Sequence, residues 1–138
     1  MLIDTNMTNS HTNLIYPDLS YKLTGICFRV QNEYGRFLKE KRYCDLLEEG
    51  LNSAGLSYER EYSPVTNLDR VDFLIENKII VEVKAKRYIL KADLHQTQRY
   101  LQIMNIKLGL IVNFRNRFLK PNRVIRIDTD RREKYLLD

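Results

Sequence analysis

The clearest structural pattern in the chain lies in the residues Arg70-Val71-Asp72-Phe73-Leu74-Ile75-Glu76-Asn77-Lys78-Ile79-Ile80-Val81-Glu82-Val83-Lys84. On each side of its middle, strand-forming residues alternate with a period of two, as the two faces of a strand require. In the first arm, Val71, Phe73 and Ile75 therefore belong to one face, and Asp72 and Leu74 to the other. The segment 76–78 between the arms is typical of a turn. The stretch predicts an antiparallel β-hairpin.

Each arm of the hairpin carries one carboxylate, and the two lie at the same distance along the chain from the turn. A turn centred on Asn77 places Asp72 opposite Glu82 on a shared face, although a slip of one residue would change this pairing. Directly opposed residues have Cβ atoms roughly 4.5–5.5 Å apart, where like charges repel unless a cation lies between them. Lys84 points the same way and adds an ammonium group. Ordinary solvated charges on an exposed sheet face are the alternative interpretation.

Length and composition suit a single domain. The chain has 138 residues, of which 43% are apolar and 30% are charged. We expect a flexible N-terminal arm at 1–15, one domain at 16–129 and a charged tail at 130–138. With no apolar run of about 18 residues and no secretory leader, the expectation is a cytoplasmic protein that does not enter a membrane. Cys27 and Cys44 lack metal-type spacing and are interpreted as buried thiols.

Positive charge is concentrated in the second half of the chain. Residues 1–69 hold 7 Lys/Arg against 10 Asp/Glu, whereas residues 70–138 hold 16 against 8, so the halves carry −3 and +8. A basic surface of this kind favours an anionic partner, of which the nucleic-acid backbone is the commonest. Simple solubilisation by Lys and Arg is the alternative.

Periodicity and turn residues place the other elements around the hairpin. The expected elements, in chain order, are helices at 19–34 and 37–53, strands at 57–64, 70–76 and 79–86, a helix at 93–104, and strands at 108–114 and 124–127. The first helix is expected to be capped by Asp18 or Ser20. The run 108–114 is almost wholly apolar, as in a strand buried on both faces and reached by a crossover helix. The pattern predicts a mixed α/β domain whose three-strand meander keeps the hairpin away from the sheet edge.

Two further sites on helices deserve comparison with the hairpin. Glu40 lies near the start of the second helix, where the helix dipole favours a carboxylate, and it either stays exposed or is aimed at Asp72 and Glu82. Gln96 and Tyr100 are four residues apart and are therefore neighbours on one helix face. Taken alone, that pair is consistent with ordinary surface chemistry.

Taken together, these residues resemble the PD-(D/E)XK nuclease superfamily, with Val71-Asp72, nine intervening residues and Glu82-Val83-Lys84 in place of its signature. More narrowly, the chain looks like the bacterial GxxExxER family. That likeness rests on Glu33-Tyr34-Gly35, Glu40 with Tyr43, Gly55-Leu56, Ile80 to Lys84, Gln96 with Tyr100 and Leu101, and 108–114. The chain departs from these patterns at Phe37, Cys44 and Val71. The resemblance implies a restriction-endonuclease-like core made of N-terminal helices, a three-strand meander, a crossover helix and a further strand.

The resemblance also implies roles for individual residues. Asp72 and Glu82 would bind Mg²⁺ (or Mn²⁺), with the Val83 carbonyl and Glu40 as further ligands. Lys84 would orient the attacking water and stabilise charge on the phosphate. Gln96 and Tyr100 would support the catalytic site. Mg²⁺ chemistry agrees with this set, since the ion takes a few carboxylates, several waters and phosphate oxygens, and the two histidines are too few for a zinc site.

The implied function is a metal-dependent nuclease that hydrolyses DNA by in-line attack of a metal-activated water, with RNA left open as a substrate. The candidate phosphate contacts are Lys86, Arg87, Arg99, Arg115 and Arg117. The alternative is a catalytically inactive module of the same fold that binds nucleic acid or a protein partner. A protein partner or a homodimer stays open in either case.

Overall fold

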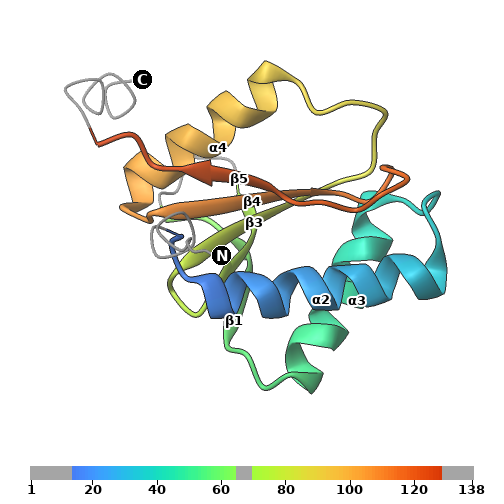
Figure 1. The fold of residues 1–138 in the computed structure, drawn as a ribbon. Coiled ribbons are helices and arrows are strands. Elements are labelled where there is room, and N and C mark those ends of the chain that lie inside the picture. Colours follow the sequence, from blue (N-terminus) through green and yellow to red (C-terminus); the bar gives the residue numbers. More distant parts are fainter. Residues whose placement is uncertain (1–13, 65–69, 129–138) are drawn as a thin grey trace, which may run out of the picture.

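The hairpin lies at the centre of a five-stranded mixed sheet in the computed structural model, which describes residues 14–64 and 70–128 (Figure 1). The sheet order is β1-β2-β3-β4-β5, and only β3 and β4 run parallel. The strands are β1 (Tyr58–Tyr62), β2 (Val71–Ile75), β3 (Ile79–Lys84), β4 (Leu108–Asn113) and β5 (Asn122–Ile125). The predicted meander and the interior position of the hairpin are confirmed.

The turn of the hairpin has the expected register. Ile75 pairs with Ile79 and Phe73 with Val81, so the turn is centred on Asn77. Glu76 and Asn77 both have positive φ, at 54° and 55°, and the Lys78 amide donates to the Ile75 carbonyl at 2.9 Å. Two consecutive residues in this conformation give the tight turn whose twist matches that of the flanking strands.

The apolar run of the sequence forms β4, every residue of which is buried. It pairs in parallel with β3 from Ile79↔Leu108 to Lys84↔Asn113. The crossover between these two strands is α4 (Lys91–Met104), as parallel pairing requires. The last strand was predicted at 124–127 but forms at Asn122–Ile125, because it pairs with β4 from Ile111↔Asn122 to Leu108↔Ile125.

Two helices cover one face of the sheet, and one helix covers the other (Figure 1). The helices α2 (Pro17–Tyr34) and α3 (Glu40–Ser53) pack with residues such as Phe73, Ile75 and Val81 in the larger apolar cluster. On the opposite face, α4 packs through Tyr100 and Leu101 in a second cluster. Cys27 and Cys44 are buried free thiols on the first face, as predicted.

Small residues allow the helices to approach closely. A Cβ built on Gly50 of α3 would lie 2.4 Å from Ile26 Cγ2 on α2. A Cβ built on Gly109 of β4 would lie 2.7 Å from Thr97 Cγ2 on α4. Both distances are too short for any real contact, so glycine sets the separation of α2 from α3 and of α4 from the sheet.

The beginnings of both N-terminal helices differ from prediction. Pro17 is the first residue of α2 and Tyr16 its N-cap, so capping by Asp18 or Ser20 is wrong; Ser20 instead donates its hydroxyl to the Tyr16 carbonyl at 2.6 Å. Proline suits this first position because the amide it lacks has no partner there. The second helix begins at Glu40 rather than 37. The Tyr43 hydroxyl holds the preceding connection by donating to the Gly35 carbonyl at 2.5 Å and accepting from the Leu38 amide at 3.2 Å.

Most of the predicted arm (1–15) and all of the predicted tail (130–138) lie outside the described residues. The domain boundaries therefore stay predictions. Among the helices that the structure describes, none combines the length and apolar character needed to cross a membrane.

Candidate active site

The backbone pairing between β2 and β3 gives way to side-chain contacts at Asp72 and Glu82. The paired residues end at Phe73↔Val81. Immediately beyond them, the Asp72 amide donates to Glu82 Oε1 at 3.0 Å, and the Val83 amide donates to Asp72 Oδ2 at 2.7 Å. The two carboxylates are thus brought together by the hairpin register, with each using one oxygen to hold the other strand's backbone.

The alternation of β2 breaks at the same place. Phe73 and Ile75 pack beneath α2 and α3, but Val71 packs in the α4 cluster. The prediction that Val71 shares a face with Phe73 and Ile75 is therefore wrong. Across the sheet, Glu61 of β1 has a positive φ of 54°, and the adjoining Tyr62, which pairs with Val71, also packs on the α4 side. Strict alternation therefore ends between Phe73 and Val71, at the point where β1 carries this left-handed residue.

Asp72 faces a cavity toward α3. The cavity has a volume of about 410 Å³, and Glu40, Cys44, Arg60 and Asp72 contribute to its wall. Glu40, the first residue of α3, is exposed and lies at this cavity. Its negative charge contributes to the raised pKa of Asp72 and of Glu82, after burial, which is the main cause for both. Glu40 is thus exposed, as in the first of its two alternatives, and it also lines the cavity that Asp72 faces, so its role as a ligand stays a prediction.

Arg60 was missed by the sequence analysis. It lies in the wall of the same cavity, held 2.8 Å from Asp45 Oδ1 and 2.9 Å from Glu48 Oε1 on α3. Its guanidinium is one of the charges that oppose the rise in the Asp72 pKa. The only sequence signal was a basic residue inside the first strand, which by itself does not separate a site residue from a surface one.

The ionisation of the carboxylate pair is unfavourable in the isolated protein. Glu82 is only 6% exposed. Burial, followed by the charge of Asp72, raises the pKa of Glu82 to about 8, while the Asp72 amide and the Lys84 ammonium oppose the rise. Burial also raises the pKa of Asp72, against the hydrogen bond from Val83. Asp72 is half-buried and Glu82 buried, and two acids that resist joint ionisation form a site that a cation would stabilise.

Asp93 is a second residue that the sequence analysis overlooked, and it forms an ion pair with Lys84. The Lys84 ammonium lies 3.9 Å from Asp93 Oδ1, and the Lys86 ammonium lies 2.6 Å from Asp93 Oδ2. Asp93 also accepts a hydrogen bond from the Leu90 amide at 2.7 Å, at the start of α4. Burial by itself raises the pKa of Asp93, but Lys86 and the Leu90 amide outweigh it and the pKa is lowered. Its position at the predicted helix start was the available signal.

Gln96 and Tyr100 meet on α4, as their spacing predicts. Gln96 Nε2 donates to the Tyr100 hydroxyl at 3.3 Å. Tyr100 is buried in the same cluster as Leu74 and Ile80, which share with Lys84 the α4 side of the sheet. The pair therefore belongs to the helix that also positions Lys84 through Asp93.

The candidate phosphate contacts differ in their exposure and in the contacts that they already make. Arg117 and Arg87 are exposed, whereas Arg99 is half-buried on α4. Lys86 is engaged with Asp93. Arg115 is half-buried and donates to the carbonyls of Arg36 at 3.2 Å and Ala85 at 3.5 Å, so part of its guanidinium already joins neighbouring loops.

The donor set at the hairpin fits a hard divalent cation through two carboxylates. Each of Asp72 and Glu82 keeps one oxygen that accepts no hydrogen bond from residues 14–64 or 70–128. Carboxylate oxygens are the ligands that Mg²⁺ and Mn²⁺ prefer. Within the same ranges, no three His, Cys, Asp or Glu side chains are already grouped to hold a metal ion. Substrate oxygens and water would therefore supply most of the coordination sphere.

Comparison with known proteins gives one family. The family described as PD-(D/E)XK nuclease superfamily matches residues 17–127, which is more than half of the chain. The matched range includes both carboxylates, Lys84 and the whole sheet. No curated protein and no solved structure matches significantly.

Proposed function

Since the chain belongs to the PD-(D/E)XK nuclease superfamily, we propose that it is a metal-dependent nuclease that hydrolyses phosphodiester bonds of DNA. Within the superfamily we assign it to the GxxExxER family. Members of the superfamily are usually nuclease hydrolases that use divalent metals and act on nucleic acid. The substrate, the ion and the activity of this chain are the parts that we propose.

A single observation carries the proposal: at the end of the β2–β3 ladder, a half-buried and a buried carboxylate each accept a hydrogen bond from the backbone of the other strand. Asp72 and Glu82 lock each other's position through the backbone of the opposite strand. Burial is the main cause of their raised pKa values, so ionisation of both carboxyls in the folded chain is unfavourable without an added positive charge. Mg²⁺ or Mn²⁺ bound by these two residues, with the Val83 carbonyl and Glu40 as further ligands, would supply charge for the phosphate and acidify a water.

The remaining residues act on the substrate and on geometry. Lys84 carries an ammonium beside the carboxylates, where it would orient the attacking water and offset negative charge that develops on the phosphate. Asp93 holds that ammonium from α4. Gln96 and Tyr100, joined on α4, would support this side of the site. Lys86, Arg87, Arg99, Arg115 and Arg117 are the proposed phosphate contacts.

Cleavage assays test the proposal directly. Single-stranded and double-stranded DNA are incubated with Mg²⁺ or Mn²⁺ and either wild type, Asp72→Ala or Lys84→Ala. We expect the wild type to cut and each variant to lose at least about 100-fold in rate, the scale seen when a charged group that stabilises the transition state is removed. Activity that survives both substitutions comes from a contaminant and does not support the assignment.

The rival function has its own outcome in the same experiment. A chain that binds DNA but leaves it intact, with wild type and both variants binding equally, is an inactive nuclease-fold module. Glu40→Gln and the matched exposed Glu49→Gln, both on α3, then separate a metal ligand from a surface carboxylate: only the first is expected to weaken Mn²⁺ binding.

A further inference from the structure

Three connections between secondary-structure elements gather at one end of the molecule. They are the α2–α3 connection (35–39), the β3–α4 connection (85–90) and the β4–β5 connection (114–121). Figure 1 shows all three at the end of the sheet where β3 and β4 finish, on the same side as the last turn of α2. Segments that are far apart in the sequence therefore share one surface.

Each connection exposes one aromatic ring beside a guanidinium group. Phe37, Tyr88 and Phe118 are 73%, 68% and 80% exposed. Arg87 lies 6.0 Å from the centre of the Tyr88 ring, and Arg117 lies 5.6 Å from that of Phe118. The Phe37 ring has guanidiniums from two connections, Arg36 at 5.0 Å and Arg115 at 5.3 Å. We refer to Phe37, Tyr88, Phe118 and these four arginines as the aromatic platform.

The platform is held by hydrogen bonds among its connections. Arg36 Nε donates to the Arg115 carbonyl at 3.0 Å, and Arg115 Nε donates to the Arg36 carbonyl at 3.2 Å. Asn113 accepts from the Lys86 amide at 3.1 Å and donates to the Lys86 carbonyl at 2.7 Å. Asn113 is the last residue of β4, and Arg115 Nη2 links the β4–β5 connection to the β3–α4 connection by donating to the Ala85 carbonyl at 3.5 Å. Because these bonds join all three connections, their relative positions are set before any ligand binds, which lowers the entropy cost of binding.

Charge on the three connections has a single sign. Residues 35–39, 85–90 and 114–121 contain no Asp or Glu. Their basic residues are Arg36, Lys39, Lys86, Arg87, Arg115, Arg117 and Lys120. Lys86 is paired with Asp93, but a surface that gathers exposed rings and several cations is poorly suited to solubility alone. Its chemistry complements a polyanion that also carries flat apolar groups.

We infer that the aromatic platform binds unpaired nucleotides, so that the DNA presented to the proposed nuclease site is single-stranded. This inference rests on the proposed function. Phosphate contacts from Arg and Lys form with single and double strands alike. Stacking on an aromatic ring requires the face of a base, and in a duplex those faces are covered by neighbouring base pairs. The rings therefore favour the single strand.

The platform is continuous with the proposed catalytic site. The β3–α4 connection begins directly after Lys84, and the Phe114 amide at the start of the β4–β5 connection donates to the Lys84 carbonyl at 2.9 Å. Lys86, on the same connection as Tyr88, shares Asp93 with Lys84. A strand whose bases stack on the platform would bring its backbone to the end of β3, where the proposed water-positioning lysine lies.

Binding without cleavage tests the inference. Fluorescence anisotropy in EDTA compares a labelled single strand free of self-complementarity with its blunt duplex, for wild type, Phe37→Leu, Tyr88→Leu and Phe118→Leu. We expect each substitution to lower affinity for the single strand about fivefold or more, the scale of one base–aromatic stack. Affinity for the duplex is expected to change by less than about twofold, since its base faces are not available.

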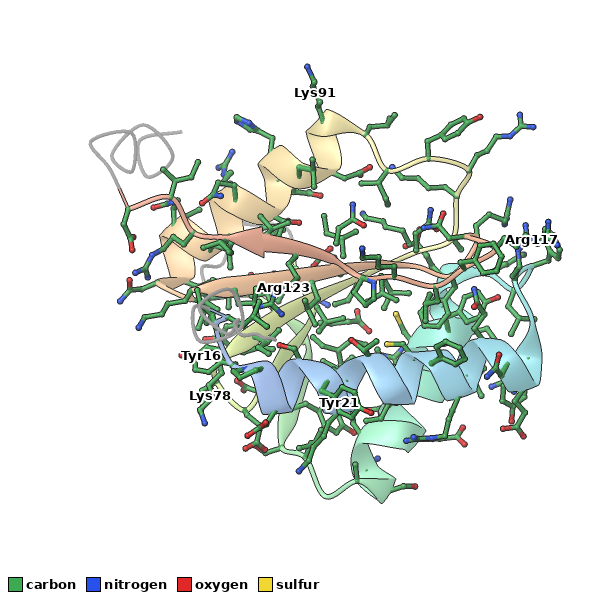
Figure 2. All side chains as sticks on the ribbon, in the orientation of Figure 1. Tyr16, Tyr21, Lys78, Lys91, Arg117 and Arg123 are labelled. Atoms are coloured by element: carbon green, nitrogen blue, oxygen red, sulfur yellow. The ribbon has the colours of Figure 1, made fainter. Side chains whose placement is uncertain are left out.

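Two controls sharpen the comparison. Tyr21 is 81% exposed but lies on α2 away from Arg117 (Figure 2), so Tyr21→Leu is expected to leave both affinities unchanged. Arg117→Gln removes a charge and should lower the affinity for both the single strand and the duplex. The slope of log affinity against log salt concentration should fall by about one unit. Equal losses for single strand and duplex in the three ring variants, or no loss at all, would overturn the inference.

The outcomes for the platform and for the proposed function are distinguishable. If the wild type cuts no DNA while the ring variants lose affinity for the single strand alone, the proposed nuclease activity is refuted and the binding role of the aromatic platform is supported. Cleavage by a wild type whose ring variants bind the single strand normally refutes the platform alone. Leucine substitutions at exposed positions are expected to leave the far-ultraviolet circular dichroism unchanged.

Discussion

Asp72 and Glu82 are joined through the backbone: the Asp72 amide donates to Glu82 Oε1 at 3.0 Å, one residue beyond the last backbone pair of β2 and β3. The Val83 amide returns a bond to Asp72 Oδ2 at 2.7 Å. Within the described residues, the two carboxylates thus link the strands at this place. Substitution of either residue changes both the charge of the site and the local strand pairing, so amide variants, which keep an acceptor oxygen, are the informative ones.

The raised pKa of Glu82 predicts a loss of stability with rising pH. In the unfolded chain this carboxyl ionises near its ordinary value of 4.5, whereas in the folded chain its pKa is about 8. Between these values the folded state binds more protons, so the free energy of unfolding falls as pH rises. Glu82→Gln should reduce this slope, leaving the part that comes from the raised pKa of Asp72, and be the more stable protein at pH 8 by about 1 kcal/mol or more. Urea unfolding at pH 5 and pH 8 measures it.

Glu49→Gln on the exposed surface of α3 is the control, since it removes one carboxylate far from the pair. It should leave the pH dependence of wild type in place. A wild type whose free energy of unfolding is the same at pH 5 and pH 8 in metal-free buffer would contradict the prediction.

Divalent metal should stabilise the folded chain through the same two carboxylates. A ligand at 100 times its dissociation constant stabilises by about 2.7 kcal/mol, so Mg²⁺ or Mn²⁺ should raise the Tm of wild type in thermal melts. The rise should be larger at pH 8 than at pH 5, because ligating carboxylates must lose their protons. Asp72→Asn and Glu82→Gln should show little rise. An equal rise in these variants would place metal binding elsewhere.

Asp93 is expected to position Lys84. Its carboxylate holds the Lys84 ammonium at 3.9 Å, and its Oδ2 also accepts from the Leu90 amide. Asp93→Asn removes the charge but keeps an oxygen for that amide, so α4 should stay capped while kcat falls about tenfold, the lower end for residues that orient a metal-site group. Steady-state cleavage should show the effect in kcat with KM nearly unchanged. A fall in kcat for Asp93→Ala together with an unchanged kcat for Asp93→Asn would assign Asp93 to helix capping alone.

Gly109 sets the distance between α4 and the sheet. Gly109→Ala would place a methyl group 2.7 Å from Thr97 Cγ2, and overpacking of this kind costs about 1–3 kcal/mol. Thermal or urea unfolding should show the loss. Gly25→Ala in α2 is the matched control: its new Cβ would meet only Arg29 Nη1 at 3.7 Å, and the change should stabilise by about 0.5–1 kcal/mol through helix propensity. Equal effects of the two substitutions would contradict close packing of α4.

Local patterns in the sequence predicted the centre of the fold correctly. Alternation and a three-residue turn were enough to set the hairpin register and to bring Asp72 to Glu82, because both depend on residues within fifteen positions of each other. The continuous apolar run of β4 predicted a strand buried on both faces for the same reason. Side chains four apart on a helix likewise met, as Gln96 and Tyr100 do.

How these parts face one another depends on packing between elements that are distant in the sequence. Val71 packs on the α4 side, opposite a stretch of β1 in which Glu61 is left-handed, and no alternation pattern within β2 contains that neighbour. Asp93 reaches Lys84 because α4 crosses back over the sheet. The three connections of the aromatic platform lie as many as 79 positions apart, as in the bond from Arg36 to Arg115. Sequence periodicity describes each element's own faces, and contacts between distant elements arise only when those faces are packed together.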